Sequence, residues 1–399
     1  METPTTLISS PAGTLAVLCA VAALFFFLEQ RTRAKLFQFV PPLLFIYATP
    51  VLLNNLNVIP STSPVYSGLS TWALPAFIVL MLIKVNIPAV VRVMGRGVLV
   101  MLMGTAGVIV GGVVAYLIVH PALSEDAWTG YGALAGSWIG GTANLLATSE
   151  ILNTPPQQVG LAVIADNAVY LVWLPILLAS RNFATRFNTW ARVPEDRIAS
   201  MEAAANLHTE RETPPTMQQY LYLAAIAIGV TWLASAAAPL ITATFPAGST
   251  LSAMFSESTV RILLVTTIAL LLSMTPVSRL PNSTALGTAL VYIFVAGMGA
   301  RASVSGLAEA PAFVAGAYIW IFIHGAFCLA GAWLFRVDVH SVAIASAANI
   351  GAAASAPIVA AHHKPSLVPV SILMALLGYA MGNYLAPLTG QLARIAAGQ

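Results

Sequence analysis

The sequence predicts an all-α membrane protein made of inverted repeats of about five transmembrane helices, each repeat carrying a re-entrant or broken glycine-rich segment. Three observations lead to this fold class. Of the 399 residues, 58% are hydrophobic and only 8% are charged. The mean hydropathy is +0.85, so one soluble core cannot cover the apolar surface and lipid must serve as solvent. A motif rich in Gly, Ser and Asn also occurs twice, at 136–144 and 346–351, each time followed by an apolar segment that ends in proline.

Ten apolar runs mark the approximate positions of helices that would cross a hydrocarbon layer about 30 Å thick. Five lie in the first half, at 15–28, 36–53, 69–83, 97–119 and 159–179. Five more lie in the second half, at 220–241, 260–274, 285–299, 312–335 and 367–388. Two further segments, 132–152 and 341–361, mix apolar with small and polar residues, which is typical of helices that break at a binding site in mid-membrane.

Basic residues indicate the orientation of the chain in the membrane. Placing Arg31, Arg33 and Lys35 in the cytoplasm puts the N-terminus outside. A full crossing by 132–152 would then put the arginine-rich stretch 181–217 outside, whereas a re-entrant hairpin returns it to the cytoplasm. Because the basic residues stand in short clusters between apolar runs, the net charge of +3 does not predict a nucleic-acid partner.

The predicted organisation has three parts in a bacterial cytoplasmic membrane. Residues 1–180 form the first inverted repeat, 181–217 a cytoplasmic linker with an amphipathic helix at 198–207, and 218–399 the second inverted repeat. The repeats are inverted because each contains an odd number of crossings. The apolar outer helices are also compatible with a homodimer.

Asp166 is the most informative single residue, because it lies within an apolar run and directly precedes Asn167. A carboxylate at mid-membrane costs about 3 kcal/mol unless it faces a partner, a cation or water. Carboxylate and amide oxygens are ligands of the hard type that Na⁺ uses, and a carboxylate can equally carry a proton. We therefore assign Asp166 and Asn167 to ion coupling, with Na⁺ as the candidate metal and no other cofactor. A structural hydrogen bond to a neighbouring helix is the alternative.

The two broken segments supply the other candidate site residues, because paired glycines allow unwinding that turns backbone carbonyls towards a solute or ion. For substrate binding we assign Ser137, Trp138, Asn144, Ser346, Asn349, Ser355 and Arg301. For ion coupling we add Thr142, Glu150 and Asn383. Simpler roles stay open for three of them: Trp138 as packing, Glu150 as a solvated end of a hairpin, and Arg301 as a snorkelling cation.

The motifs GSWIGGTAN at 136–144, VIADNA at 163–168 and ANIG at 348–351 resemble those of the YjcL-like family of uncharacterised integral membrane proteins of bacteria and plants. The resemblance covers nearly the whole chain. More distantly, the paired hairpins are similar to those of sodium-coupled glutamate and citrate symporters and of bile-acid sodium symporters. That resemblance implies a scaffold domain and a core domain that moves as a unit.

These features predict a secondary active transporter, coupled to Na⁺ or H⁺, that moves a small polar or anionic solute by alternating access. Membrane lipid and a small-molecule solute are the expected partners. A channel is the alternative. An intramembrane hydrolase that uses Ser355 and His362 is less favoured, because H-E-x-x-H, G-x-S-x-G and P-loop motifs are missing from the sequence, so we do not expect an enzyme.

Overall fold

The computed structural model describes residues 6–32, 37, 42–85, 95–194, 214–246, 255–302 and 308–399, and within these ranges it contains helices and no strands. The predicted all-helical class is confirmed. The first half contains α1 (Pro11–Thr32), α3 (Pro42–Asn55), α4 (Pro64–Gly68), the π-helix η1 (Leu69–Ala73), α5 (Leu74–Leu82), α7 (Arg96–Val119), η2 (His120–Ala122), α8 (Ala127–Ile151), α9 (Pro156–Ser180), η3 (Arg181–Phe183) and α10 (Ala184–Trp190). The second half contains α12 (Met217–Thr242), α14 (Glu257–Ser273), η4 (Pro276–Arg279), α15 (Ser283–Arg301), α16 (Ala310–Phe335), α17 (Val339–Ile350), α18 (Ala352–His363), η6 (Pro365–Leu367) and α19 (Val368–Ala396).

Eight helical stretches in the described ranges are long and apolar enough to cross a membrane. They correspond to eight of the ten predicted runs. The run at 36–53 gives α3, whose described part has 14 residues, and the run at 260–274 gives α14, with 17 residues. The start of the predicted linker is helical, because η3 and α10 continue from α9. The predicted amphipathic helix at 198–207, and Arg33 and Lys35, lie outside the described residues.

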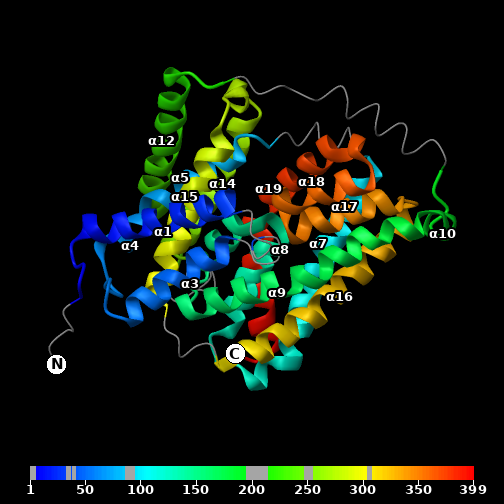
Figure 1. The fold of residues 1–399 in the computed structure, drawn as a ribbon, viewed down its shortest axis with the longest axis horizontal. Helices are drawn as coiled ribbons and strands as arrows, with labels where there is room; N and C mark the ends of the chain where they lie inside the picture. The colour runs from blue at the N-terminus through cyan, green and yellow to red at the C-terminus, as the bar shows by residue number, and fades with distance from the viewer. Residues whose placement is uncertain are drawn as a thin grey trace.

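The helices form two groups that lie side by side (Figure 1). One group contains α1, α3, α4, α5, α12, α14 and α15, and the other contains α7, α9, α10 and α16 to α19 around α8. Helices from the two halves of the chain pack in a crosswise pattern. Thus α1 contacts α15 while α12 contacts α5, and α7 contacts α19 while α9 contacts α16.

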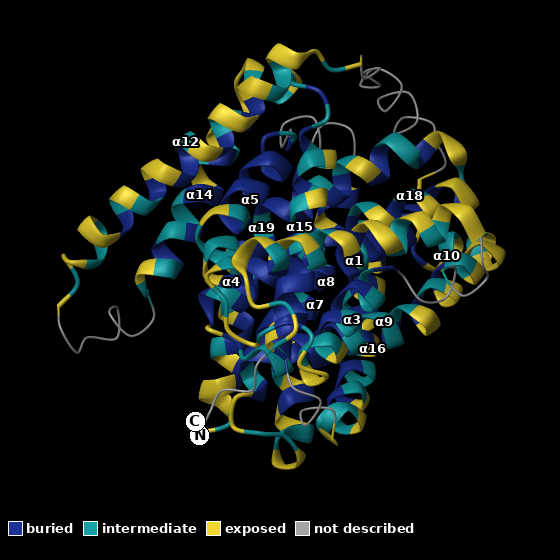
Figure 2. Cartoon of the chain, turned by 60° about the vertical axis from the view of Figure 1, so that its left-hand side comes forward, coloured by how far each residue is buried: buried dark blue, intermediate teal, exposed yellow. Residues whose placement is uncertain are grey.

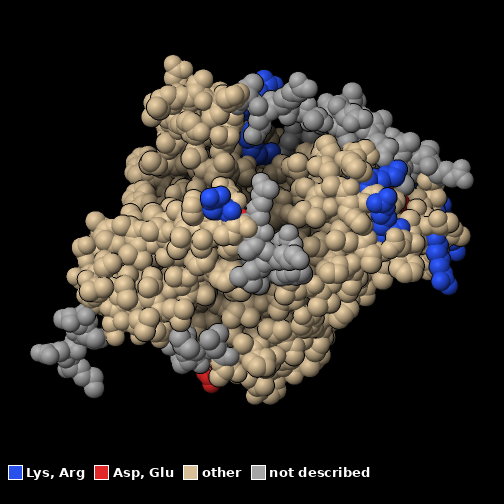
Figure 3. Space-filling view, in the orientation of Figure 1, with Lys and Arg blue, Asp and Glu red and all other residues tan. Residues whose placement is uncertain are grey.

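Burial is distributed as expected for a protein whose outer surface faces lipid. α8 is buried along nearly its whole length (Figure 2). In contrast, α12 exposes large apolar side chains such as Leu221, Trp232 and Leu240. Charged side chains are sparse on the face shown in Figure 3, where basic ones lie at the end of the molecule near α10, near the top and left of the centre. Exposing this much apolar surface to water is unfavourable in free energy. The outer helices therefore require lipid around them.

Candidate functional site

α8 folds back on itself at two glycines and forms a helical hairpin, which we call hairpin 1. Gly140 (φ −145°, ψ 18°) and Gly141 (φ 77°, ψ −176°) leave the helical region, and the positive φ of Gly141 favours glycine. A Cβ added to Gly136 would be 2.6 Å from the carbonyl oxygen of Asn144. In a straight helix these residues would be about 12 Å apart. The predicted break at the glycine pair is therefore where the chain reverses.

α17 and α18 form a second helical hairpin, hairpin 2, which turns between Gly351 (φ −128°) and Ala352 (φ 47°). At its open end, Nδ1 of His340 lies 3.0 Å from Nδ1 of His363. These histidines are the second residue of α17 and the last residue of α18. The two arms are thus antiparallel.

The turns of the two hairpins meet inside the protein. A Cβ added to Gly141 would be 2.9 Å from the Cβ of Ala352 and 3.2 Å from Cε1 of Tyr379 in α19. All three residues are buried. The two glycine-containing turns, which are 211 residues apart in the chain, therefore form one junction.

The hairpins reach this junction from opposite ends of α9. At the first turn of α9, Nε2 of Gln158 donates to Oγ of Ser124, just before hairpin 1, at 2.8 Å. At the other end of α9, the carbonyl oxygen of Leu177 accepts from Nε2 of His363 in hairpin 2 at 2.9 Å. α9 is about 37 Å long, so it connects the open ends of the two hairpins and passes their turns midway.

Asp166 lies in the middle of α9 and binds hairpin 1. Ser137 Oγ donates to its Oδ2 at 2.8 Å, and Trp138 Nε1 donates to its Oδ1 at 2.9 Å. Trp138 also packs on the Trp320 ring with a centroid separation of 4.7 Å, so its predicted packing role and its polar role coexist. In the described ranges no basic side chain forms an ion pair with Asp166. Each carboxylate oxygen keeps acceptor capacity for a cation or proton.

Tyr170, one turn after Asp166, extends the contact of α9 to hairpin 2. Its Cε2 atom would be 3.2 Å from a Cβ added to Gly351. A single turn of α9 thus touches both hairpins, with the carboxylate on one side and the tyrosine ring on the other. Tyr170 was not among the predicted site residues, because tyrosine in an apolar run carries no signal of its own.

Ser346 belongs to a buried hydrogen-bond network rather than to the surroundings of Asp166. Its Oγ accepts from Trp173 Nε1 at 2.9 Å and lies 3.0 Å from His324 Nε2. Nδ1 of His324 lies 2.9 Å from the carbonyl oxygen of Gly104. Because a carbonyl can only accept, Nδ1 carries the proton, and Nε2 accepts from Ser346.

Replacing Ser346 with alanine is expected to destabilise the protein by about 1–3 kcal/mol, because Trp173 Nε1 and His324 Nε2 would lose a buried partner. The measurement is thermal unfolding of the purified protein in detergent. Ser371→Ala is the matched control, since Ser371 donates only to the carbonyl of Val368 within its own helix. Equal unfolding temperatures for the two variants would contradict the network.

The remaining predicted residues of the two hairpins bond locally or to neighbouring helices. Asn144 Nδ2 donates to the carbonyl of Tyr379 at 3.1 Å, and the Asn349 amide lies 2.9 Å from Thr105 Oγ1. Ser355 Oγ donates across hairpin 2 to the carbonyl of Ala347 at 2.9 Å. The Asn144 and Asn349 contacts hold the hairpins to α19 and α7, and the Ser355 contact joins the two arms of hairpin 2. None of the three is a hydrogen bond to Asp166.

The other predicted ion-coupling residues are spread along the same helices. Asn167 Nδ2 donates to the carbonyl of Val163 within α9 at 2.7 Å. Asn383 Nδ2 donates to Thr266 Oγ1 at 2.9 Å, and its buried Oδ1 has no partner among the described residues. Thr142 is half-buried beside the turn of hairpin 1. The structure therefore brings together Asp166, Ser137 and Trp138, but not the whole predicted set.

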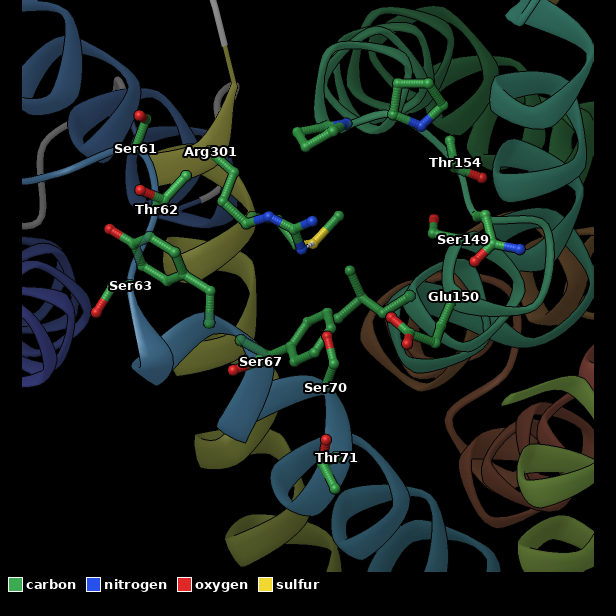
Figure 4. A pocket seen from close by; sticks show the side chains of 17 residues that line it. Ser61, Thr62, Ser63, Ser67, Ser70, Thr71, Ser149, Glu150, Thr154 and Arg301 are labelled. Atoms are coloured by element: carbon green, nitrogen blue, oxygen red, sulfur yellow. Dashed lines mark hydrogen bonds between the residues drawn. The ribbon is translucent and has the colours of Figure 1, made fainter. Parts of the chain in front are cut away.

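A polar cavity of about 640 Å³ lies between the two helix groups and contains Arg301 and Glu150 (Figure 4). Arg301, at the end of α15, points into it from one wall, and Glu150, in the second arm of hairpin 1, lies on the other. Arg261 Nη2 is 3.9 Å from Glu150 Oε1. Hydroxyl groups complete the first wall: Ser61, Thr62, Ser63, Ser67, Ser70 and Thr71.

This hydroxyl wall was not among the predicted site residues. Its signal in the sequence is a dense run of Ser and Thr at 61–71 immediately before an apolar segment. Part of the wall is formed by the π-helix η1. Local π-helical turns occur frequently at functional sites, but they cannot be recognised from one sequence.

The junction would offer a cation the carboxylate of Asp166, which is held by hairpin 1. In the parts of the chain that the structure describes, no three His, Cys, Asp or Glu side chains converge as metal ligands. A Na⁺ ion would have to combine Asp166 with backbone carbonyls of the interrupted helices, which are hard oxygen ligands.

Comparison with known proteins agrees with the resemblance drawn from the three motifs. The chain is similar to the uncharacterized membrane protein YjcL of Bacillus subtilis (strain 168), with 25% identity over 375 residues that cover 91% of this chain and 92% of that protein. The model of a family described as "Protein of unknown function (DUF819)" matches residues 16–395. The chain therefore belongs to the DUF819 family and is a multi-span membrane protein.

Proposed function

We propose that the protein is a secondary active transporter, coupled to Na⁺ or H⁺, that moves a small polar or anionic solute by alternating access. The observation that carries this proposal is the position of Asp166, which meets hairpin 1 within one turn of where α9 meets hairpin 2. Transporters place their ion and substrate sites near the bilayer midplane, between interrupted helices.

The proposed membrane arrangement follows from α9. Asp166 is about 15 Å from the first residue of α9, which is half the thickness of the hydrocarbon layer. Both hairpins are then re-entrant, one from each side, and the crosswise contacts of α1, α12, α7 and α16 support inverted repeats of 1–180 and 218–399. The excess of basic residues on cytoplasmic loops supports an N-terminus outside and a linker in the cytoplasm. In this orientation the cavity that contains Arg301 would face outside.

In this proposal the cation compensates the charge of Asp166 and so stabilises the junction. Ser137 and Trp138 hold the carboxylate in one orientation, leaving its remaining lone pairs for the ion. The group around the hairpins then moves against the group of α1, α3 to α5, α12, α14 and α15. The cavity lies between these groups, so their relative movement would open it to one side or the other.

The proposal is tested with purified protein in proteoliposomes on a solid-supported membrane. A panel of carboxylates, hydroxy acids, amino acids and short peptides is applied in NaCl or choline chloride, and with or without an inward proton gradient. At least one solute is expected to give a transient current that requires the Na⁺ or proton gradient. A steady current without solute would favour a channel. The absence of a transient current with every solute in every gradient would contradict coupled transport.

A further inference from the structure

The cavity between the helix groups carries one charged side chain of each sign on its lining. Arg301 comes from α15 and Glu150 from hairpin 1, and the two approach from opposite walls (Figure 4). The rest of the polar lining consists of neutral hydroxyl and amide groups from 61–71, Ser149, Asn153 and Thr154. The charged groups, and not the hydroxyl groups, are therefore expected to decide which class of solute the cavity accepts.

Arg301 is available for a carboxylate. Among the described residues it forms no ion pair, and its Nη1 atom lies 3.9 Å from the Met298 sulfur. Guanidinium binds carboxylate through two parallel hydrogen bonds. A solute carboxylate inside the cavity would form such a pair with Arg301.

Glu150 is only loosely compensated by Arg261. Their separation of 3.9 Å is longer than the roughly 2.7–2.9 Å of a direct charge-assisted hydrogen bond. Arg261 is not part of the cavity lining, and its buried Nε has no partner among the described residues. A carboxylate on the lining repels a simple anion but attracts an ammonium group.

We propose that the cavity selects a zwitterionic solute, an amino acid or a short peptide, whose carboxylate pairs with Arg301 and whose ammonium group pairs with Glu150. This inference rests on the proposed transport function and narrows its substrate class. A volume of about 640 Å³ is within the usual range for small-molecule sites, roughly 300–1,000 Å³. A cavity of this size is larger than one amino acid and can hold a short peptide that contacts the hydroxyl-lined wall.

The test measures binding to the purified protein in detergent, without any gradient. Free amino acids and dipeptides are screened by thermal stabilisation, and the best binder is compared with its N-acetyl form, which lacks the ammonium group, and its C-terminal amide, which lacks the carboxylate. Each modified form is expected to bind about 10- to 100-fold more weakly, because one charge-assisted contact is lost.

Two variants assign the ends of the solute. Glu150→Gln is expected to bind the free solute and its N-acetyl form equally well. Arg301→Gln is expected to bind the free solute and its amide equally well. Glu257→Gln, at the exposed start of α14, and Arg279→Gln, in η4, are controls that keep both preferences. Because each result is a ratio of two affinities of one variant, a change in overall stability does not imitate it.

Three outcomes would overturn the inference: no binder among the zwitterions, equal binding of the N-acetyl form, or unchanged preferences in Glu150→Gln and Arg301→Gln. Tighter binding of plain carboxylates would indicate that Arg261 fully compensates Glu150 and that the solute is an anion. These binding results are separate from the transport test, because coupled currents with a simple anion would retain the transporter and remove only the zwitterion.

Discussion

Asp166→Asn is expected to abolish cation-dependent transport, with coupled currents reduced by about 100-fold or more. The substitution keeps the size of the side chain but removes the charge that would hold Na⁺ or a proton, and one lost charged contact of about 3 kcal/mol corresponds to roughly that factor. It also replaces one oxygen with an NH₂ group, so either Ser137 or Trp138 faces a donor where it now has an acceptor. The measurement is the solute-induced current with and without the cation gradient.

The control for this prediction is Asp126→Asn, the same chemical change at an exposed carboxylate just before hairpin 1. It should leave the currents at the level of the unmodified protein. A second readout separates coupling from folding: Na⁺ should raise the unfolding temperature of the unmodified protein relative to choline, because a bound ion stabilises the folded state, and Asp166→Asn should lose this response. Full coupled current in folded Asp166→Asn would remove Asp166 from ion coupling.

Part of the site could be predicted because it depends on local sequence. Gly140 and Gly141 predict a break wherever they stand in an apolar helix, and the structure places the reversal of hairpin 1 at that pair. An acidic residue in an apolar run requires a buried partner, and Asp166 has two. Helical class and most spans follow from hydropathy, because backbone groups in lipid must be satisfied within a helix.

The partners of the polar residues could not be predicted, because hydropathy carries no information about which faces meet. Ser346 and His324 are 22 residues apart on different helices, and nothing in the chain pairs them with Trp173. The turn of hairpin 2 uses Ala352 at positive φ, so the second turn lacks the glycine pair that marks the first. The start of α14 was also missed, because this helix begins at Glu257, before the run at 260–274, and the polar residues of its first turn lower the local hydropathy.

Gly378→Ala is expected to destabilise the protein by about 1–3 kcal/mol or more, the cost of overpacking a tight interior. α19 passes the turn of hairpin 1 so closely that a Cβ on Gly378 would overlap the carbonyl oxygen of Ile139, directly before the glycine pair. That oxygen belongs to the backbone and cannot rotate away, so the hairpin or α19 must shift. The measurement is the thermal unfolding temperature in detergent, together with the yield of folded protein.

Gly229→Ala in α12 is the matched control and should shift stability in the opposite direction. A Cβ on Gly229 meets nothing within 4 Å, and alanine is favoured over glycine inside a helix by about 0.5–1 kcal/mol. The same substitution in two helices thus separates the helical preference of alanine from the close contact at the junction. Equal stability of the two variants would mean that α19 does not pack against hairpin 1 at Gly378. In that case α19 would not be part of the junction beside Asp166.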